Sequence, residues 1–351
     1  MMNSLFKKIV FYLYSVILKP IPQKYYKHII SMFEKFILAT RKISLGHTII
    51  VDQQIQNVKF KIRVRKNNLQ AHYTYTDLLK DKDVVYKPST IVCLNSILKI
   101  QKKPIFADVG AFVGHYACYV SKLLNYDTPV YALEANSSFC EDIRRNASLN
   151  NISNIEVINS ILSDKKEESF VYDVAVMNPQ ELEQKKLISN DYYNEVLKSG
   201  RKIFTTTIDD VFKEKEIMPN IVKLDAHGAE GKILSGSKNL LKNNVNYILM
   251  EVHTPKDLEM YSPGYTNVDI VKGLIDLDFN CYLISPHSDG HRKLFDVDWT
   301  NAQSYLNNTS KLKYINVEKD LAEGILYDRS FIDLFILAIK KEINVDSLDC
   351  F

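Results

Sequence analysis

The stretch PIFADVGAFVG, residues 104–114, decides the fold class of this 351-residue chain. Its apolar run Ile105–Val109 indicates a short buried strand, and a helical stretch from Gly114 to Leu124 follows after a turn. At the turn, Gly110 permits a tight bend and the close approach of a ligand, and Gly114 lets the helix pack against the strand. The start of that helix offers unpaired N–H groups and the positive end of a dipole. The stretch therefore predicts a strand–turn–helix unit with a ligand site at the turn.

This turn differs from the one that binds dinucleotides. The dinucleotide fingerprint is Gly-x-Gly-x-x-Gly, and Phe112 stands in place of its second glycine. In addition, Asp108 lies two residues before the first glycine. A carboxylate there repels a diphosphate and attracts an ammonium or sulfonium group. The turn thus favours a ligand that carries a positive charge.

Apolar runs and helical stretches alternate along the rest of the chain. Further strands are predicted at 129–133, 155–158, 220–224, 247–252, 281–284 and 331–338, and helices at 138–150, 231–242 and 268–277. Strands that alternate with helices form βαβ units and a mostly parallel sheet, and continuously apolar strands indicate helices on both faces. We therefore expect a doubly wound, Rossmann-like α/β sheet. A polar stretch near 177–203 breaks the pattern and is interpreted as an insertion or lid.

Two regions are predicted before the α/β domain, which takes residues 104–351. Residues 1–44 form a basic, amphipathic helical arm, and residues 45–103 form a cap or substrate-side region. The cap region holds an alternating strand at 58–64 and a helix for which Ser89 is the expected N-cap.

The charge of the chain is concentrated in the arm. The net charge is +3, but the arm carries +7 and the remaining chain −4. The apolar run Ile9–Leu18 has about half the length that a membrane-spanning helix needs, and no signal cleavage site follows it. Two interpretations stay open: the arm lies in a membrane interface, or it packs on its own domain or on a second subunit.

The cysteines indicate a reducing compartment. The five residues are Cys93, Cys118, Cys140, Cys281 and Cys350. They are scattered, without a Cys-x-x-Cys pair or zinc-ligand spacing. Reduced thiols are typical of cytosolic proteins, so we expect a cytoplasmic location, with peripheral membrane contact through the arm as the alternative.

A second candidate ligand contact is Glu134, which ends the strand after the first helix. In doubly wound folds an acidic side chain at this place hydrogen-bonds ribose hydroxyls. Asp108 and Glu134 would then lie at adjacent strand ends. The alternative is that Glu134 is a solvated residue on the rim.

Charged side chains also surround the end of a later strand, in KLDAHGAEG, residues 223–231. Charges beside Leu224 at the end of an apolar strand are costly unless they are paired or functional. Lys223 shares a strand face with Asp225 and can hold that carboxylate ionised, or it can simply be salt-bridged to Asp225 or Glu230.

Several blocks of sequence occur in a fixed order over about half of the chain. They are Asp108–Gly114, Glu134-Ala135, Asn146 with Asn150, Ile161–Asp164, Thr206–Asp210, Lys223–Glu230 and Glu251–His253. This order resembles the FkbM-type methyltransferases, a branch of the class I S-adenosylmethionine-dependent enzymes. The resemblance implies a class I methyltransferase sheet that binds this cofactor. The residues that it implies for binding are Asp108, Gly110, Ala111, Gly114, Glu134, Ser163, Asp164 and Asp225.

Three positions depart from the family pattern. Phe112 replaces the usual Asn, and His227 replaces the Glu of the Asp-Val-Glu-Gly block. After Glu134, where the family has Pro, this chain has Ala135 followed by Asn136. The departures at Phe112 and His227 leave open a protein that binds the cofactor without turnover and acts as a scaffold.

Methyl transfer is an in-line displacement in which the enzyme positions the acceptor and removes its proton. Asp225 and His253 are expected just past neighbouring strand ends, above one cleft. We favour His253 as the general base because a neutral imidazole works near pH 7. His227 is the reserve, and Lys223 supports Asp225.

A metal ion is a further hypothesis. Asp225, Glu251 and Glu230 could bind a hard divalent cation that acidifies an acceptor hydroxyl. The resemblance implies hydroxyls on sugars, glycans or other small molecules as acceptors. The basic arm leaves nucleic-acid methylation as a weaker alternative, since its charge is segregated from the motif domain; we expect no nucleic-acid partner.

Overall fold

The computed structural model describes residues 48–65, 87–172, 175–177, 201–284, 312, 314–317 and 334–350. The predicted arm at 1–44 and residues 178–200 of the predicted insertion lie outside the described residues. The chain divides into two compact units, one of Met1–Ile49 with Val64–Tyr73 and one of Ile50–Arg63 with Thr74–Phe351. The first unit is described only at 48–49 and 64–65, so the described sheets and helices belong almost wholly to the second.

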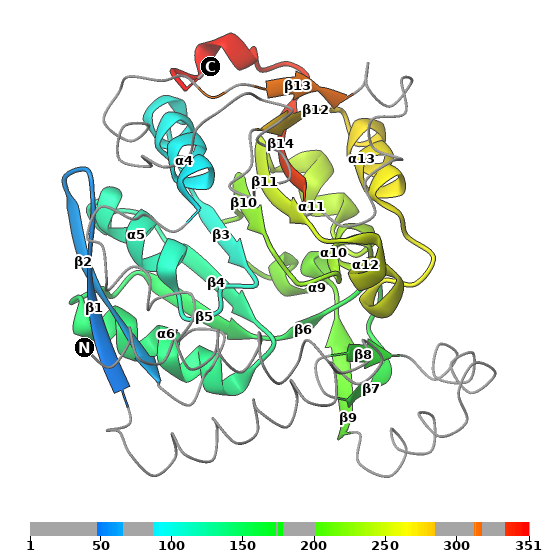
Figure 1. The fold of residues 1–351 in the computed structure, drawn as a ribbon, viewed down its shortest axis with the longest axis horizontal. Helices are drawn as coiled ribbons and strands as arrows, with labels where there is room; N and C mark the ends of the chain where they lie inside the picture. The colour runs from blue at the N-terminus through cyan, green and yellow to red at the C-terminus, as the bar shows by residue number, and fades with distance from the viewer. Residues whose placement is uncertain are drawn as a thin grey trace, which may run out of the picture. The chain divides into compact units, whose positions relative to one another are not determined.

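Within the described residues, the central sheet has eight strands in the order β13-β12-β14-β11-β10-β3-β4-β5 (Figure 1). Their bounds are β3 Phe106–Val109, β4 Val130–Glu134, β5 Ile155–Asn159, β10 Ile221–Leu224, β11 Tyr247–Val252, β12 Phe279–Ile284, β13 Tyr314–Asn316 and β14 Leu334–Lys340. Strands β11, β10, β3, β4 and β5 are parallel, and β14 pairs antiparallel with both β11 and β12. The strands predicted from apolar runs are therefore confirmed.

Helices cover both faces of this sheet. They are α4 Pro88–Ile100, α5 His115–Leu123, α6 Ser137–Leu149, α9 Ile208–Phe212, α10 Glu230–Ser235, α11 Lys238–Asn243, α12 Pro255–Tyr261 and α13 Asn267–Asp276, with a 3₁₀ turn η4 at Val345–Ser347. Helices α4, α5 and α6 lie on one side, and α10, α11 and α13 on the other (Figure 1). From β3 the chain winds outward to β4 and β5, and it later returns beside β3 to continue through β10 and β11. The doubly wound fold is confirmed, and its topological switch point lies between β3 and β10.

The interior explains why the strands are continuously apolar. Every residue of β3, β4, β10, β11 and β14 is buried. Because helices lie over both faces, neither alternate set of side chains on these strands reaches solvent. Polar groups on the same strands, such as Lys223 and Glu251, are therefore buried too and must find partners.

Two asparagines one helical turn apart fasten a strand to this core. Strand β2 (Val58–Arg65) pairs with β1 (Thr48–Ile55). On its other side, Asn150, the C-cap of α6, exchanges two hydrogen bonds with the backbone of Lys61, and Asn146 of α6 exchanges two with the backbone of Arg63. The side-chain amides thus take the place of a neighbouring strand, and the Asn-x-x-x-Asn block has a structural role.

A smaller sheet was not predicted. It has the order β6-β9-β7-β8, with β6 Ile161–Leu162, β7 Glu168–Tyr172, β8 Ala175–Met177 and β9 Arg201–Thr206. Because β8 ends at Met177 and β9 begins at Arg201, the predicted insertion joins two strands of this sheet.

Two helix predictions need correction. Ser89 is not an N-cap: α4 begins at Pro88 after Lys87, which has a left-handed backbone (φ 48°), and Ser89 is buried inside the helix. The helix predicted at 231–242 is two helices, α10 and α11, which are separated at Gly236. A Cβ atom there would lie 2.2 Å from the carbonyl oxygen of Ser163, so a glycine is required where the small sheet meets this break. Among the described helices, none is long and apolar enough to cross a membrane.

Candidate active site at the carboxyl ends of β10 and β11

The switch point brings the turn after β3 against the turn after β10. Val109 and Leu224 are partners in the parallel ladder, and the N–H of Asp225 donates to the carbonyl of Val109 (3.1 Å). Gly110 has φ +73°, and a Cβ atom there would lie 1.9 Å from the carbonyl oxygen of Asp225. The glycine therefore serves contact between two backbone turns.

The backbone donors of the first turn are largely used inside the protein. The N–H groups of Gly110 and Ala111 both donate to the carbonyl of Leu133, and that of Gly114 donates to Ala111. A Cβ atom on Gly114 would lie 3.0 Å from Ile143 of α6. This glycine allows helix-to-helix packing rather than the predicted helix-to-strand contact, and the turn offers fewer unpaired donors than the sequence suggested.

Glu134 closes the same turn from the neighbouring strand. Its Oε2 accepts the N–H of Phe112 (2.8 Å), and its Oε1 accepts the N–H of Asn136 (2.9 Å). Burial raises the pKa of Glu134, although these two N–H groups oppose that rise. The ring of Phe112, whose backbone is left-handed (φ 54°), meets Phe139 at 4.8 Å between centroids. Aromatic contact thus holds the turn where the family pattern has Asn.

Asp108 and Lys223 form a buried ion pair between β3 and β10. Lys223 Nζ lies 3.1 Å from Asp108 Oδ1 and donates to the carbonyl of Gly110 at 3.1 Å. Burial raises the pKa of Asp108, and Lys223 opposes the rise. Burial lowers the pKa of Lys223, but Asp108 and Asp225 outweigh it and raise the pKa overall. The Asp108 carboxylate is fully buried, so in this structure it acts on the site through Lys223.

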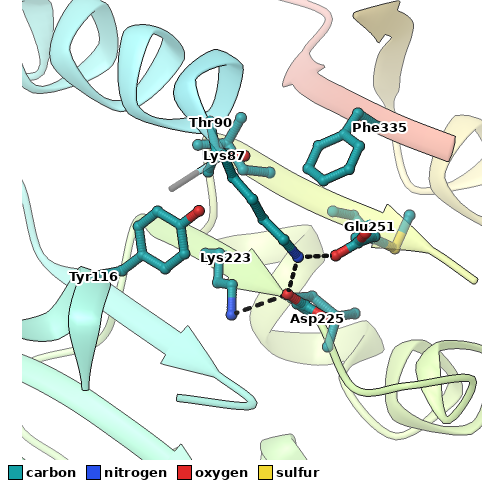
Figure 2. Close-up of a pocket in the computed structure, with 10 residues that line it drawn as sticks. Lys87, Thr90, Tyr116, Lys223, Asp225, Glu251 and Phe335 are labelled. Atoms are coloured by element: carbon teal, nitrogen blue, oxygen red, sulfur yellow. Dashed lines mark hydrogen bonds and ion pairs between the residues drawn. The ribbon is translucent and has the colours of Figure 1, made fainter. Parts of the chain in front are cut away.

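A second lysine, Lys87, lies between two carboxylates of the site (Figure 2). Its Nζ contacts Asp225 Oδ2 at 2.7 Å and also pairs with Glu251 Oε2. Figure 2 shows the side chain reaching from the start of α4 toward the ends of β10 and β11, between Tyr116 and Phe335. Sequence reasoning missed Lys87, and the one available signal was a lysine directly before a proline that begins an apolar helix.

His253 is held between two carboxylates. Its Nδ1 lies 2.9 Å from Glu230 Oε1, and its Nε2 lies 3.8 Å from Asp225 Oδ1. Glu230 is fully buried, and the same oxygen accepts the N–H groups of Ala226 (2.9 Å) and Gly228 (3.2 Å).

The pKa shifts distinguish these groups. Burial raises the pKa of Asp225, but Lys87, Lys223 and His253 outweigh it and hold that pKa well below its usual range. Burial and the nearby Asp225 raise the pKa of Glu251 to about 7. Burial lowers the pKa of His253, but Glu230, Asp225 and Glu251 outweigh it and raise the pKa to about 9. The ring is therefore charged at neutral pH, whereas the expectation for a general base was a neutral imidazole.

The other predicted site residues lie around this network. The exposed His227 stacks edge-on with His253, with ring centroids 4.9 Å apart. The structure gathers Asp225, His227 and His253, in place of the metal set Asp225, Glu251 and Glu230 expected from the sequence. Ser163 donates to Asp164 (2.9 Å), and its backbone meets β9 and Gly236. A cofactor contact of Ser163 and Asp164 stays a prediction.

Comparison with known proteins finds a family match over the same region of the chain. Residues 108–270 match the methyltransferase FkbM domain. The matched residues make up less than half of the chain. The chain is similar to the hexuronic acid methyltransferase AglP of Haloferax volcanii, with 26% identity over 184 residues that cover 51% of this chain and 70% of the relative.

Solved structures of methyltransferases are also similar. An FkbM methyltransferase from Methylobacillus flagellatus is 16% identical, with a TM-score of 0.29, over 44% of this chain and 36% of that one. The M. capricolum TrmK complex with S-adenosylhomocysteine is 11% identical, with a TM-score of 0.33, over 70% and 67%. The fold itself rests on the strand order described above. The FkbM domain makes the chain an S-adenosylmethionine-dependent methyltransferase.

The residues at the switch point fit this cofactor. Each oxygen of Glu134 accepts one backbone N–H and so keeps acceptor capacity for a ribose hydroxyl. The carboxylate of Glu134 gives the region the negative charge that a sulfonium or ammonium group needs, whereas Lys223 balances the charge of Asp108 at the neighbouring strand end. Glu134 would hold the ribose, and Asp108 would act through Lys223 and the turn at Gly110.

Proposed function

We propose that this methyltransferase acts on a hydroxyl group of a sugar, a glycan or another small molecule. The observation that carries the proposal is the group of proton-handling side chains, Glu251, Asp225 and His253, at the ends of β10 and β11. A hydroxyl must lose a proton as its oxygen is methylated, so a hydroxyl acceptor needs such a group. The relative that acts on hexuronic acids supports an acceptor of the sugar class.

When bound, S-adenosylmethionine supplies a methyl group on a positively charged sulfur and leaves as S-adenosylhomocysteine. The residues of the chain then have two tasks, which are to hold the acceptor oxygen in line with that methyl group and to take up its proton.

Glu251 is the proton acceptor in this proposal. Both ring nitrogens of His253 already face carboxylates, those of Glu230 and Asp225. Glu251 lines a pocket at the ends of β10 and β11 that Asp225 and Tyr116 also line, and its pairing with Lys87 engages Oε2. Lys87 holds the Glu251 carboxylate through an ion pair and links it to Asp225, which His253 orients. This assignment replaces the general base that we expected from the sequence.

The test is transfer of a labelled methyl group to matched acceptors. The acceptors are a glucuronic acid glycoside, the corresponding neutral glucoside and the corresponding amino sugar. We expect label in a hydroxyl-bearing acceptor, in a product that survives mild alkaline hydrolysis, because a methyl ether is stable to base and a methyl ester is not. Label that base releases from the glucuronic acid product, or label only on the amine, would contradict methylation of a hydroxyl.

A further inference from the structure

Asp225, His227 and His253 offer three ligand atoms that lie within 4.8 Å of one another. Asp225 and His253 follow the neighbouring strands β10 and β11, and His227 lies two residues beyond Asp225. The Asp225 Oδ1 to His253 Nε2 distance is 3.8 Å. Metal–ligand bonds of about 2.0–2.2 Å put two ligand atoms on one ion up to roughly 4.4 Å apart. The Asp225 and His253 atoms therefore already fit one ion. The most distant two of the three ligand atoms need to approach each other only slightly.

Asp225 divides its two oxygens between two sides of the site. Oδ2 lies 2.7 Å from Lys87 Nζ and 3.7 Å from Lys223 Nζ. Oδ1 is the oxygen that faces the imidazole of His253. The ammonium groups therefore approach the carboxylate from the side away from the histidine, and an ion on the histidine side need not displace them.

Glu230 contacts the ring nitrogen of His253 that faces away from Asp225, and metal-bound histidines usually have such a partner. A histidine that binds a metal through one ring nitrogen generally has its other nitrogen hydrogen-bonded to a carboxylate or carbonyl, which fixes the ring. Here Nδ1 meets Glu230 Oε1 at 2.9 Å, and two backbone N–H groups fix that carboxylate. Because Nδ1 is held in this way, Nε2 is the ligand atom directed at Asp225.

The charge of the surroundings also favours a divalent cation. A metal-bound imidazole is neutral, so binding of an ion releases the proton of His253. Four carboxylates of this network then face two ammonium groups, an excess of two negative charges when all are ionised. The carboxylates are those of Asp108, Asp225, Glu230 and Glu251, and the ammonium groups are those of Lys87 and Lys223. An excess of this kind in a buried site is stabilised by a cation.

We propose that Asp225, His227 and His253 bind a divalent ion of the first-row transition metals, with Glu230 fixing His253 from behind. Two imidazole nitrogens and one carboxylate oxygen suit Mn²⁺ to Zn²⁺, whereas Mg²⁺ and Ca²⁺ prefer oxygen ligands alone. The ion therefore differs in kind from the hard cation expected from the sequence. The proposal concerns binding of the ion and holds whatever the acceptor is.

Cobalt is the probe, because Co²⁺ bound by protein ligands absorbs visible light. The full chain, stripped of metal and of any histidine tag, is titrated with Co²⁺, and Zn²⁺ is then added to displace it. We expect one Co²⁺ per chain. We also expect affinity at least about tenfold lower in His253→Gln and in Glu230→Gln, the size of loss known for residues that support a ligand. His227→Asn should lose affinity similarly, and Asn tolerates the left-handed backbone at this position (φ 50°).

Two further variants make the outcome decisive. Glu141→Gln changes an exposed carboxylate of α6 that pairs with Arg145, so it should bind Co²⁺ as the wild type does. Lys87→Met removes a positive charge from Asp225 and should bind Co²⁺ more tightly, the opposite of the other variants. Thermal melting checks that each variant is folded. No Co²⁺ binding by the wild type, or unchanged affinity in folded His227→Asn and His253→Gln, would overturn the proposal.

Discussion

Gly110 and Asp225 touch through their backbones, since a Cβ atom on Gly110 would lie 1.9 Å from the carbonyl oxygen of Asp225. In most doubly wound sheets a crevice opens at the switch point, between the turns that follow the two central strands. Here the turn after β3 belongs to the predicted cofactor site, and the turn after β10 carries Asp225, which belongs to the proposed acceptor site. This contact fixes the two halves of the site relative to each other without any side chain.

Gly110→Ala should therefore unfold more easily and lose cofactor binding. The alanine must take a left-handed φ, which costs about 1 kcal/mol, and its Cβ must also push the two turns apart. Thermal melting and calorimetry with S-adenosylmethionine measure the two effects. Gly264→Ala is the control, because Gly264 also has a positive φ (+87°) but a Cβ there meets nothing within 4 Å. Equal losses of stability in the two variants would show that the contact with Asp225 does not matter.

Glu134→Gln should weaken cofactor binding by about 1–3 kcal/mol, because charge-assisted hydrogen bonds become neutral ones. The same change weakens the bonds from Phe112 and Asn136 that shape the turn. Calorimetric titration with S-adenosylhomocysteine measures the loss. Glu156→Gln, at an exposed position of β5, is the matched control and should bind normally. Wild-type affinity in Glu134→Gln would remove Glu134 from the cofactor site.

Asn146 and Asn150 have different contacts: both bind strand β2, but only Asn146 also contacts the turn after β3. Both amides pair with β2, but Asn146 Nδ2 additionally donates to the carbonyl of Val113 (2.8 Å). Each Asn→Ala change should lower the free energy of unfolding by about 1–3 kcal/mol, because buried backbone groups lose their partners. Only Asn146→Ala should also weaken cofactor binding. If Asn150→Ala weakens cofactor binding equally, β2 itself supports the site.

The sequence predicted the central sheet well because its strands are buried on both faces and carry an unbroken apolar signal. It also placed Asp108, Glu134, Asp225 and His253 at neighbouring strand ends, since the carboxyl ends of parallel strands meet at one edge. The small sheet was not predicted because its strands are short and lack that apolar signal. Lys87 escaped because it meets Asp225, 138 residues away in sequence, only through the packing of α4. No local pattern contains that contact.

The charge state of His253 shows the same limit on sequence reasoning. A histidine after a strand suggested a neutral base, but the partner that decides its pKa is Glu230. The block that contains Glu230 gave no sign that its side chain turns back toward β11. A buried carboxylate at 2.9 Å favours the charged ring, and only the folded arrangement shows it.

Glu251→Gln should abolish most turnover and leave cofactor binding unchanged. The amide keeps the size of the side chain and can still contact Lys87, but it cannot accept a proton, and loss of a general base typically costs about 10²–10⁴-fold in rate. Single-turnover transfer to a hydroxyl acceptor measures the chemical step, and calorimetry with S-adenosylmethionine measures binding. Glu259→Gln, at an exposed position of α12, is the control and should keep both.

Because Glu251 is held by Lys87 and His253 by Glu230, their variants should differ: Glu251→Gln should lower the rate constant alone, whereas His253→Gln should also disturb Asp225 and raise the KM for the acceptor. Full turnover in Glu251→Gln, together with a large loss in His253→Gln, would return the role of general base to His253.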